Sequence, residues 1–455
     1  MNAKTESVAS PRLPYVWLVL AVAALYFISN TAGDQILHRL QSLDDAPAVP
    51  VLGAMVLFCL CSFASFYATR GTPLPSFVVA IALGIAGHKL FAPIVDNPVA
   101  LSALVTGSAA IILFSGGLEM PLREFLRLLV KIALLALPGV LITGFAFSWM
   151  LGQLSAAMGV PLALPVLILL GAILASTDPA AIIPVLHGVH FRKSATKDIV
   201  IAESALDDVA GALLTTVFLK LPLMGMTVAA AYRALAAPET GRFLGAQAGV
   251  GVLIGLGGWL MLWLLARGKR RHAIRYGADQ VYFLAAPIVS YTAAVAFGGS
   301  GFLAAFVAGL LFHSEEHMAE IERFFYQVID GVAKPVIFLM VGALVDVHAL
   351  LTYAPIGIAA GLLFMLAIRP LMVFLVLGVY ALMGGSPRGL SVNQLLFISF
   401  VRETGAIPAV LLVTAHAHMA NVPGLVEIGM WVILLTLVLA PPLTPYVARK
   451  LGVAN

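Results

Sequence analysis

The chain is 455 residues long, 61% of its residues are hydrophobic and only 11% are charged, and its mean hydropathy is +1.02. A soluble protein carries about 25% charged residues, and a soluble chain of this composition would expose apolar surface on every side. The composition therefore excludes an ordinary soluble protein and predicts an integral membrane protein. The net charge of +4 comes from basic residues that gather in loops on one side of the bilayer, so we expect no nucleic-acid partner.

Mostly apolar runs long enough to cross a membrane follow one another along the chain. A helix that crosses roughly 30 Å of hydrocarbon needs about 20 such residues. About fourteen runs come close to this length: 13–30, 48–69, 74–92, 99–118, 128–153, 161–187, 198–220, 241–266, 279–297, 299–313, 331–350, 354–384, 393–415 and 423–447. We therefore expect an all-α polytopic protein with 13–14 transmembrane helices.

Lys and Arg are distributed unevenly between the loops that join these runs. With the N-terminus inside the cell, the cytoplasmic loops include 123–131, 192–197 and 267–275, each with several basic residues, whereas the outer loops hold only scattered single ones. A cytoplasmic excess of Lys and Arg is what the positive-inside rule describes. The pattern predicts that both termini lie in the cytoplasm.

Charged residues inside the apolar runs are the main functional signal. Each charge at the bilayer centre costs several kcal/mol, about 2.5–3.5 by the lowest estimates. The residues concerned are Asp178, Glu203, Asp207, Asp208, Arg369, Arg402 and Glu403. They could form buried ion pairs that only hold helices together, with Glu203 and Arg402 as the best candidate pair. The acids outnumber the arginines, however, so at least one carboxylate must be protonated, solvated or bound to a cation.

The spacing of the acids in run 198–220 indicates which of them act together. Ser204 and Asp208 are four residues apart and share one helix face, as do Glu203 and Asp207. Asp207 and Asp208 diverge by about 100° and serve different neighbours. A hydroxyl and a carboxylate are hard oxygen ligands for a small cation, and a dry environment favours the protonated carboxylate. A site that holds either ion, but not both, is the minimal device for antiport.

Two of the runs contain residues that interrupt a helix. Asp178 is preceded by Thr177 and followed by Pro179, and the run 393–415 contains Gly405 and Pro408. A proline within a helix removes a hydrogen bond and frees a carbonyl. A simple kink is one interpretation of each. Two interrupted runs in opposite halves of the chain, with charges at the same depth, favour an inverted-repeat transporter with its site at the membrane midplane.

Six segments in order along residues 100–447 resemble the monovalent cation:proton antiporter superfamily, in particular its sodium/proton exchanger branch. The segment 173–186 (ILASTDPAAIIPVL) is similar to the branch's Thr-Asp-Pro helix, and 202–214 (AESALDDVAGALL) to its ion-site helix. The segment 401–412 (VRETGAIPAVLL) is similar to its late arginine helix. The remaining three are 112–127 (ILFSGGLEMPLREFLR), 299–312 (GSGFLAAFVAGLLF) and 367–375 (AIRPLMVFL).

The resemblance implies a single membrane transporter domain over 1–455, built as an inverted repeat with two crossed broken helices. It places the core helices at about 99–220 and 331–415, with the other helices as dimerisation and scaffold elements. It further implies a homodimer in the bacterial inner membrane, a role in pH homeostasis, a monovalent cation and protons as substrates, and no cofactor. The lipid bilayer is the surrounding partner.

Site roles follow from the resemblance position by position. Asp208 is the residue implied to bind the cation and the proton, with Ser204, Thr177 and Asp178 helping to form the site. Glu203 and Arg402 are implied as a structural ion pair.

The chain departs from the exchanger branch at two places near this site. Position 207 is Asp, where the branch usually has Asn, as in electrogenic relatives with two carboxylates. Those relatives pair the extra aspartate with a lysine in a later core helix, whereas here Lys334 lies only near the start of its run. Glu403 is an added acid in the late helix, and Glu403, Lys334 and Arg369 are predicted to modulate the site.

The leading interpretation is secondary exchange of Na⁺, or of K⁺ or Li⁺, for protons by alternating access. A cation-coupled symporter of a small organic solute on a related fold is the transporter alternative, but its anionic substrates would need more basic lining residues. A membrane enzyme is the third class. Histidines such as His313 and His317 lie in loops or at span ends, and no nucleophile motif, HExxH pattern or phosphate-binding loop is present.

Overall fold

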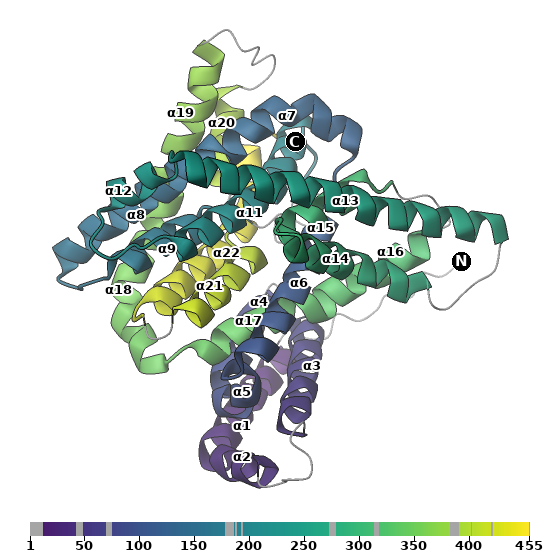
Figure 1. Cartoon of the computed structure of the whole chain (residues 1–455). Coiled ribbons are helices and arrows are strands. Elements are labelled where there is room, and N and C mark those ends of the chain that lie inside the picture. The colour runs from purple at the N-terminus through teal and green to yellow at the C-terminus, as the bar shows by residue number, and fades with distance from the viewer. Residues whose placement is uncertain are drawn as a thin grey trace, which may run out of the picture. The chain divides into compact units, whose positions relative to one another are not determined.

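The computed structural model describes residues 12–41, 49–69, 75–177, 186, 189–192, 194–272, 279–313, 318–382, 391–401, 403–419 and 422–454. Over these residues the chain is helical apart from turns and one isolated bridge between Phe191 and Ala454 (Figure 1). The helices form two compact units. Unit 1 holds the described residues up to Leu101 together with Asp330–Val345, and unit 2 holds Ser102–Ile329 and the chain from Asp346 onward.

Unit 1 contains the first helices of the chain and one later helix. They are α1 (Arg12–Thr31), α2 (Gly33–Gln41), α3 (Val49–Thr69), α4 (Ser76–Ala86), α5 (His88–Val95), the start of α6 (Pro98–Leu118), most of the π-helical turn η2 (Ile329–Ala333), and α17 (Lys334–Leu344). The pair α4 and α5 bends by 90°, and α4 packs against α17. The two backbones approach closely at a pair of glycines. A Cβ on Gly84 would lie only 3.0 Å from the Cα of Gly342.

Unit 2 contains the rest of α6 and the remaining helices. They are α7 (Leu122–Ala136), α8 (Pro138–Met158), α9 (Leu164–Leu174), α11 (Ser194–Lys220), α12 (Val228–Ala234), α13 (Pro238–His272), α14 (Asp279–Ala296), α15 (Gly301–Leu311), α16 (Ala319–Val328), α18 (Val347–Leu363), η3 (Phe364–Ile368), α19 (Arg369–Leu382), α20 (Val392–Phe400), α21 (Ala406–His418) and α22 (Leu425–Lys450). Figure 1 shows α11 among α9, α21 and α22, and α11 packs directly against α7, α9 and α21.

The helices confirm a multi-pass membrane protein. Among the described residues seven helical segments are long and apolar enough to cross a bilayer, or eight if the bent pair α4–α5 counts as one span, and four shorter apolar helices accompany them. Each predicted apolar run coincides with helix over most of its described residues. In the run 161–187, helix α9 ends at Leu174 and the next described residues, 175–177, are not helical. The run 393–415 is interrupted between α20 and α21.

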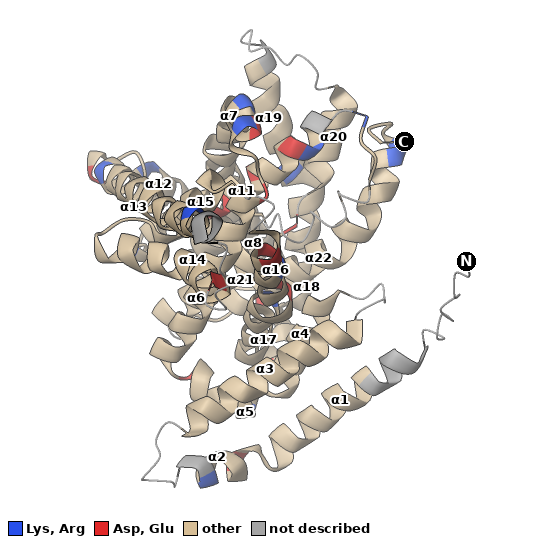
Figure 2. Ribbon diagram, turned by 90° about the vertical axis from the view of Figure 1, so that its right-hand side faces the viewer, with Lys and Arg blue, Asp and Glu red and all other residues tan. Residues whose placement is uncertain are grey.

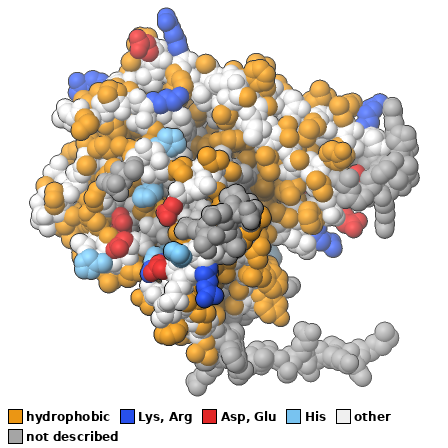
Figure 3. All heavy atoms as spheres, turned by 60° about the horizontal axis from the view of Figure 1, so that its bottom comes forward, with side chains coloured by type: hydrophobic (Ala, Val, Ile, Leu, Met, Phe, Trp, Pro, Cys, Tyr) orange, Lys and Arg blue, Asp and Glu red, His pale blue; other side chains and the backbone are white. Residues whose placement is uncertain are grey.

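The exterior of the helices is suited to lipid. Figure 2 shows long stretches of helix without Lys, Arg, Asp or Glu, and Figure 3 shows hydrophobic side chains over much of the face in view. Large apolar side chains such as Phe63 in unit 1 and Leu253 in unit 2 are 63% and 67% exposed. In water such exposure would promote aggregation, whereas in a bilayer it costs nothing.

Candidate functional site

Three of the four acids of α11 lie inside unit 2 and away from solvent. Glu203, Asp207 and Asp208 are 1%, 0% and 1% exposed. They lie in a 27-residue helix that is otherwise mostly apolar through its middle. Neighbouring helices bury the side that carries the acids, whereas Leu206 and Ala210 on another face remain partly exposed. A buried carboxylate needs a proton, a hydrogen-bond donor or a counter-charge. The neighbours of each acid therefore define what the site can do.

The two adjacent aspartates receive hydrogen bonds from two adjacent hydroxyls. Ser176 Oγ donates to Asp208 Oδ1 at 2.5 Å, and Thr177 Oγ1 donates to Asp207 Oδ2 at 3.2 Å. Both hydroxyl residues are buried and follow the end of α9, where the chain is no longer helical. Asp207 and Asp208 therefore contact different residues, as expected for adjacent positions on a helix. Asp178 lies outside the described residues, so its part in the site stays a prediction.

Ser176 was not identified by the sequence analysis. It precedes the Thr177-Asp178 pair directly, so its place beside an interrupted helix was the one available signal. A serine in an apolar run is uncharged, so placing it in the membrane does not have the high energetic cost that makes the aspartates stand out in the sequence. The structure makes it the described hydrogen-bond partner of Asp208.

Ser204 lies one turn before Asp208 on α11 and is 5% exposed. Its hydroxyl oxygen is buried, and among the described residues it has no hydrogen-bond partner. A buried hydroxyl without a partner costs about 1–3 kcal/mol. The Ser204 hydroxyl oxygen is therefore available as a ligand for a bound ion, beside a carboxylate on the same helix face.

Glu203 forms an ion pair with Arg369, in which Glu203 Oε1 lies 2.6 Å from Arg369 Nη2 and both side chains are 2% exposed. Arg369 begins α19 directly after the π-helical turn η3. Pro370 explains this wider turn, because its ring clashes with the carbonyl four residues earlier. Arg369 had been predicted only as a modulator. Arg402, the predicted partner of Glu203, lies outside the described residues, so that pair stays a prediction.

The second interrupted span meets the same helix. Helix α20 ends at Phe400 and α21 begins at Ala406, so the expected break near Gly405 is confirmed. Thr404 lies in the break and is held to α22, since its amide donates to Thr436 Oγ1 at 3.2 Å and the two hydroxyls are 2.5 Å apart. Glu403 in the break is 2% exposed. Helix α21 packs against both α9 and α11.

Buried acids outnumber buried bases among the described residues around α11. The described residues of α11, of α19 and of the break between α20 and α21 bury four carboxylates, those of Glu203, Asp207, Asp208 and Glu403, and one guanidinium, that of Arg369. Lys334, a predicted modulator, belongs to unit 1, where it pairs with Asp330 at 2.7 Å. Proton uptake or cation binding would lower the negative charge of these carboxylates.

Comparison with known proteins decides the family. The family described as sodium/hydrogen exchanger, transmembrane, matches residues 53–450. The chain belongs to the sodium/hydrogen exchanger family. It is 29% identical over 360 residues to the K⁺/H⁺ antiporter NhaP2 of Shewanella oneidensis, a match that covers 77% of this chain and 58% of the relative. It is 31% identical over 392 residues to the K⁺/H⁺ antiporter NhaP of Alkalimonas amylolytica, covering 83% and 62%.

Solved structures agree with the exchanger fold. The sodium proton antiporter MjNhaP1 of Methanocaldococcus jannaschii at pH 8 matches 96% of this chain and 98% of its own with a TM-score of 0.58 and 21% identity. A second structure of that antiporter matches with a TM-score of 0.61 and 22% identity. The exchanger fold is thus shown. The chain spans about 60% of the length of the curated relatives it matches.

Proposed function

We propose that this chain is a secondary antiporter that exchanges a monovalent cation for protons by alternating access. The observation that carries the proposal is the site on α11: two adjacent buried carboxylates, each bonded to a hydroxyl of the interrupted segment after α9, and a buried serine hydroxyl one turn away. Both the family and the names of the relatives, which are antiporters, support antiport over symport of an organic solute.

The chemistry of exchange follows from competition at Asp208. When protonated, its carboxyl group is neutral and tolerates the dry interior. When deprotonated, its charge together with the hydroxyls of Ser176 and Ser204 supplies hard oxygen ligands for a small cation. The bound cation then compensates the negative charge. Asp178 belongs to the interrupted segment that shapes this site, Thr177 orients Asp207, and Glu403 modulates the local charge.

The protein surrounding this site is proposed to follow the family pattern. The core helices lie at about 99–220 and 331–415, and the others form a scaffold through which two copies associate. The protein resides in a bacterial inner membrane with both termini in the cytoplasm and contributes to pH homeostasis.

The experiment that tests the function is exchange in proteoliposomes. Addition of Na⁺, K⁺ or Li⁺ should dissipate a preformed acid-inside pH gradient, which is measured as dequenching of a pH-sensitive dye. Na⁺ is the leading substrate, and the K⁺/H⁺ antiporters among the relatives make K⁺ the main competitor. A protein that responds to none of the three cations between pH 6 and 9 would refute the proposal.

Asp207 sets the proposed charge stoichiometry. If Asp207 carries a second proton, each cycle moves net charge, so exchange by the wild-type protein should speed up or slow down when the membrane potential is changed. Asp207→Asn should still exchange cations but lose this dependence. Thr177→Val is the matched control, because it removes the hydrogen bond to Asp207 and keeps the carboxylate. Wild-type exchange that ignores the membrane potential would show that Asp207 carries no transported charge.

Gly211 offers a test of the contact between α11 and the interrupted segment. A Cβ at this position would lie 2.7 Å from Ser176 Cβ, closer than side chains tolerate. Gly211→Ala should therefore push Ser176 away from Asp208 and lower the exchange rate about tenfold, the value of one buried hydrogen bond, although alanine favours helix. Gly257→Ala in α13 is the control, since nothing lies within 4 Å of that position. Equal exchange rates for both variants would contradict a role of the Ser176–Asp208 hydrogen bond in exchange.

A further inference from the structure

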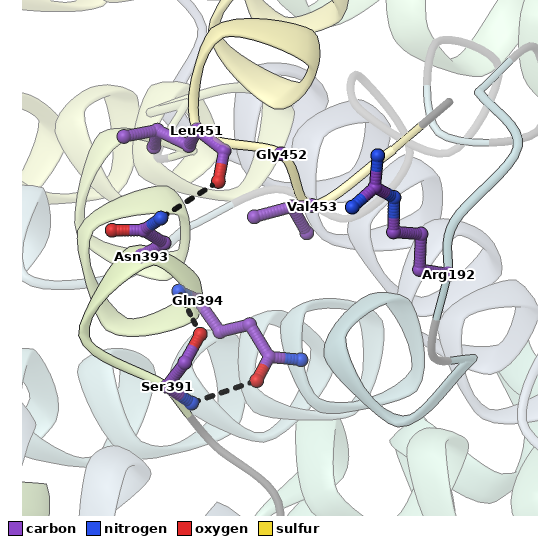
Figure 4. A pocket seen from close by; sticks show the side chains of 7 residues that line it. All are labelled: Arg192, Ser391, Asn393, Gln394, Leu451, Gly452 and Val453. Carbon is purple, nitrogen blue, oxygen red and sulfur yellow. Dashed lines mark hydrogen bonds between the residues drawn. The ribbon is translucent and has the colours of Figure 1, made fainter.

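One buried hydrogen bond joins α11 to α20, the helix that begins the second interrupted span. This second span, α20 with the break and α21, is called the interrupted span below. Gln394 Nε2 donates to Thr196 Oγ1 at 2.6 Å, and the two residues are 6% and 0% exposed. The other end of the same amide closes the cap of α20, because Gln394 Oε1 accepts from the backbone amide of Ser391 at 2.7 Å (Figure 4). Gln394 is thus held at both ends and is a fixed point for Thr196.

Thr196 lies on the helix face that carries two of the site's acids. Glu203 and Asp207 follow it by seven and eleven residues, so all three side chains point within about 20° of one direction. Each contacts a different element: Thr196 contacts Gln394, Glu203 pairs with Arg369, and Asp207 bonds Thr177. Because a helix is stiff over this length, a shift at Thr196 displaces carboxylates about 10 and 16 Å farther along.

The partner helix α20 also leads to the site. Its far end runs into the break that holds Glu403 and Thr404, and α20 packs against α19, which carries Arg369. A bond between Thr196 and Gln394 therefore sets the register between the helix that carries the aspartates and the interrupted span that packs against it.

Packed side chains and a cavity both lie close to this bond. Phe191 and Phe397 pack edge to face with 5.5 Å between ring centroids, and Asn393 Nδ2 donates to the carbonyl of Leu451 at 3.0 Å. Beside Gln394 lies a cavity of about 150 Å³, lined also by the exposed Arg192 and by Gly452 and Val453 (Figure 4). The cavity has room for a few water molecules, so loss of the bond can be solvated without collapse of the fold.

We propose that Thr196 and Gln394 are positioning residues of the ion site, which hold α11 in register with the interrupted span and thereby set the affinity for the cation and the pH range of exchange. This inference rests on the proposed antiport and adds two residues to its machinery. Neither residue touches the ion.

The test compares single and double variants in the proteoliposome assay. Thr196→Val and Gln394→Met each remove the bond while keeping the side-chain shape. Each should raise the cation concentration for half-maximal exchange about three- to tenfold and shift the pH of half-maximal exchange. The double variant should be no worse than Gln394→Met alone, because Gln394→Met already removes the bond that Thr196→Val breaks, together with the cap bond to Ser391. Thr196→Ser keeps the hydroxyl and should restore wild-type values.

Asn393→Ala is the neighbouring control, since it removes the bond to Leu451 and leaves the Thr196–Gln394 bond intact. Unchanged affinity and pH profile in Thr196→Val and Gln394→Met, with only a lower melting temperature, would overturn the proposal in favour of a merely structural bond. Additive effects in the double variant would also overturn it. If Thr196→Val does not fold, Gln394→Met against Asn393→Ala decides. Absence of exchange by the wild-type protein itself would instead contradict the proposed function.

Discussion

Asp208→Asn is expected to abolish cation–proton exchange while the protein still folds. Asparagine keeps the shape of the side chain and an oxygen that can accept the hydrogen bond from Ser176. It loses the negative charge that would bind a cation and the ability to carry a proton. Without a site that alternates between two ions, dye dequenching in proteoliposomes should fall to the level of empty liposomes for Na⁺, K⁺ and Li⁺ alike.

The control for this variant must remove an aspartate without touching the site. Asp96 is an exposed residue at the end of α5, so Asp96→Asn should exchange at the wild-type rate. Thermal unfolding in detergent and elution as a single species should match the wild type for both variants. An Asp208→Asn protein that is folded and still exchanges would remove Asp208 from the centre of the mechanism.

The broad architecture could be predicted because a bilayer imposes strict requirements on sequence. Each crossing needs about 20 apolar residues, and every backbone group must bond within its own helix. The two interruptions were visible for the same reason, since Pro179 and Gly405 stand where regular helix is expected. The acids of α11 were visible because a charge in an apolar run is costly and therefore rare.

The pairing of these acids could not be predicted to the same degree. Glu203 and Arg369 are far apart in sequence, and Arg402 offered an equally suitable charge from a resembling motif. Helical spacing identifies which residues share a face of one helix, but not which face of another helix meets it. Ser176 and Gln394 were missed because uncharged polar residues are inexpensive enough to be common in membrane helices. Their importance arises only from the close approach of two segments.

The site depends on contacts from three directions to α11. The hydroxyls after α9 hold the two aspartates, Arg369 on α19 holds Glu203, and Gln394 on α20 holds Thr196. Of these, the contacts to the aspartates must change as ions bind and leave, because the carboxylate alternates between proton and cation. The contacts of Glu203 and Thr196 need not change. We infer that α11 keeps its position against α19 and α20 while the contacts of its two aspartates change.

Loss of Arg369 alone should therefore have the largest effect on stability. Arg369→Met leaves Glu203 buried without its described counter-charge, and breaking a buried pair in this way costs about 3–5 kcal/mol. Glu203→Leu should be destabilising for the same reason. Among the described residues, Arg369 Nε and Nη1 have no hydrogen-bond partner, so desolvation offsets much of the pair's attraction. The double variant Glu203→Leu/Arg369→Met should consequently be much more stable than either single variant.

Thermal unfolding in detergent measures these differences, and an exposed ion pair provides the contrast. Lys89 and Asp34 are 2.7 Å apart, but their side chains are 29% and 75% exposed, so Lys89→Met should cost less than about 1 kcal/mol. The comparison separates burial from distance, since the two pairs have nearly the same length. A double variant as unstable as the sum of its singles would mean that each residue is held by other groups, with Arg402 as the first candidate for Glu203. Recovery of stability in the double variant, with exchange still impaired, would show that the pair orients α11 for transport and is not required for folding.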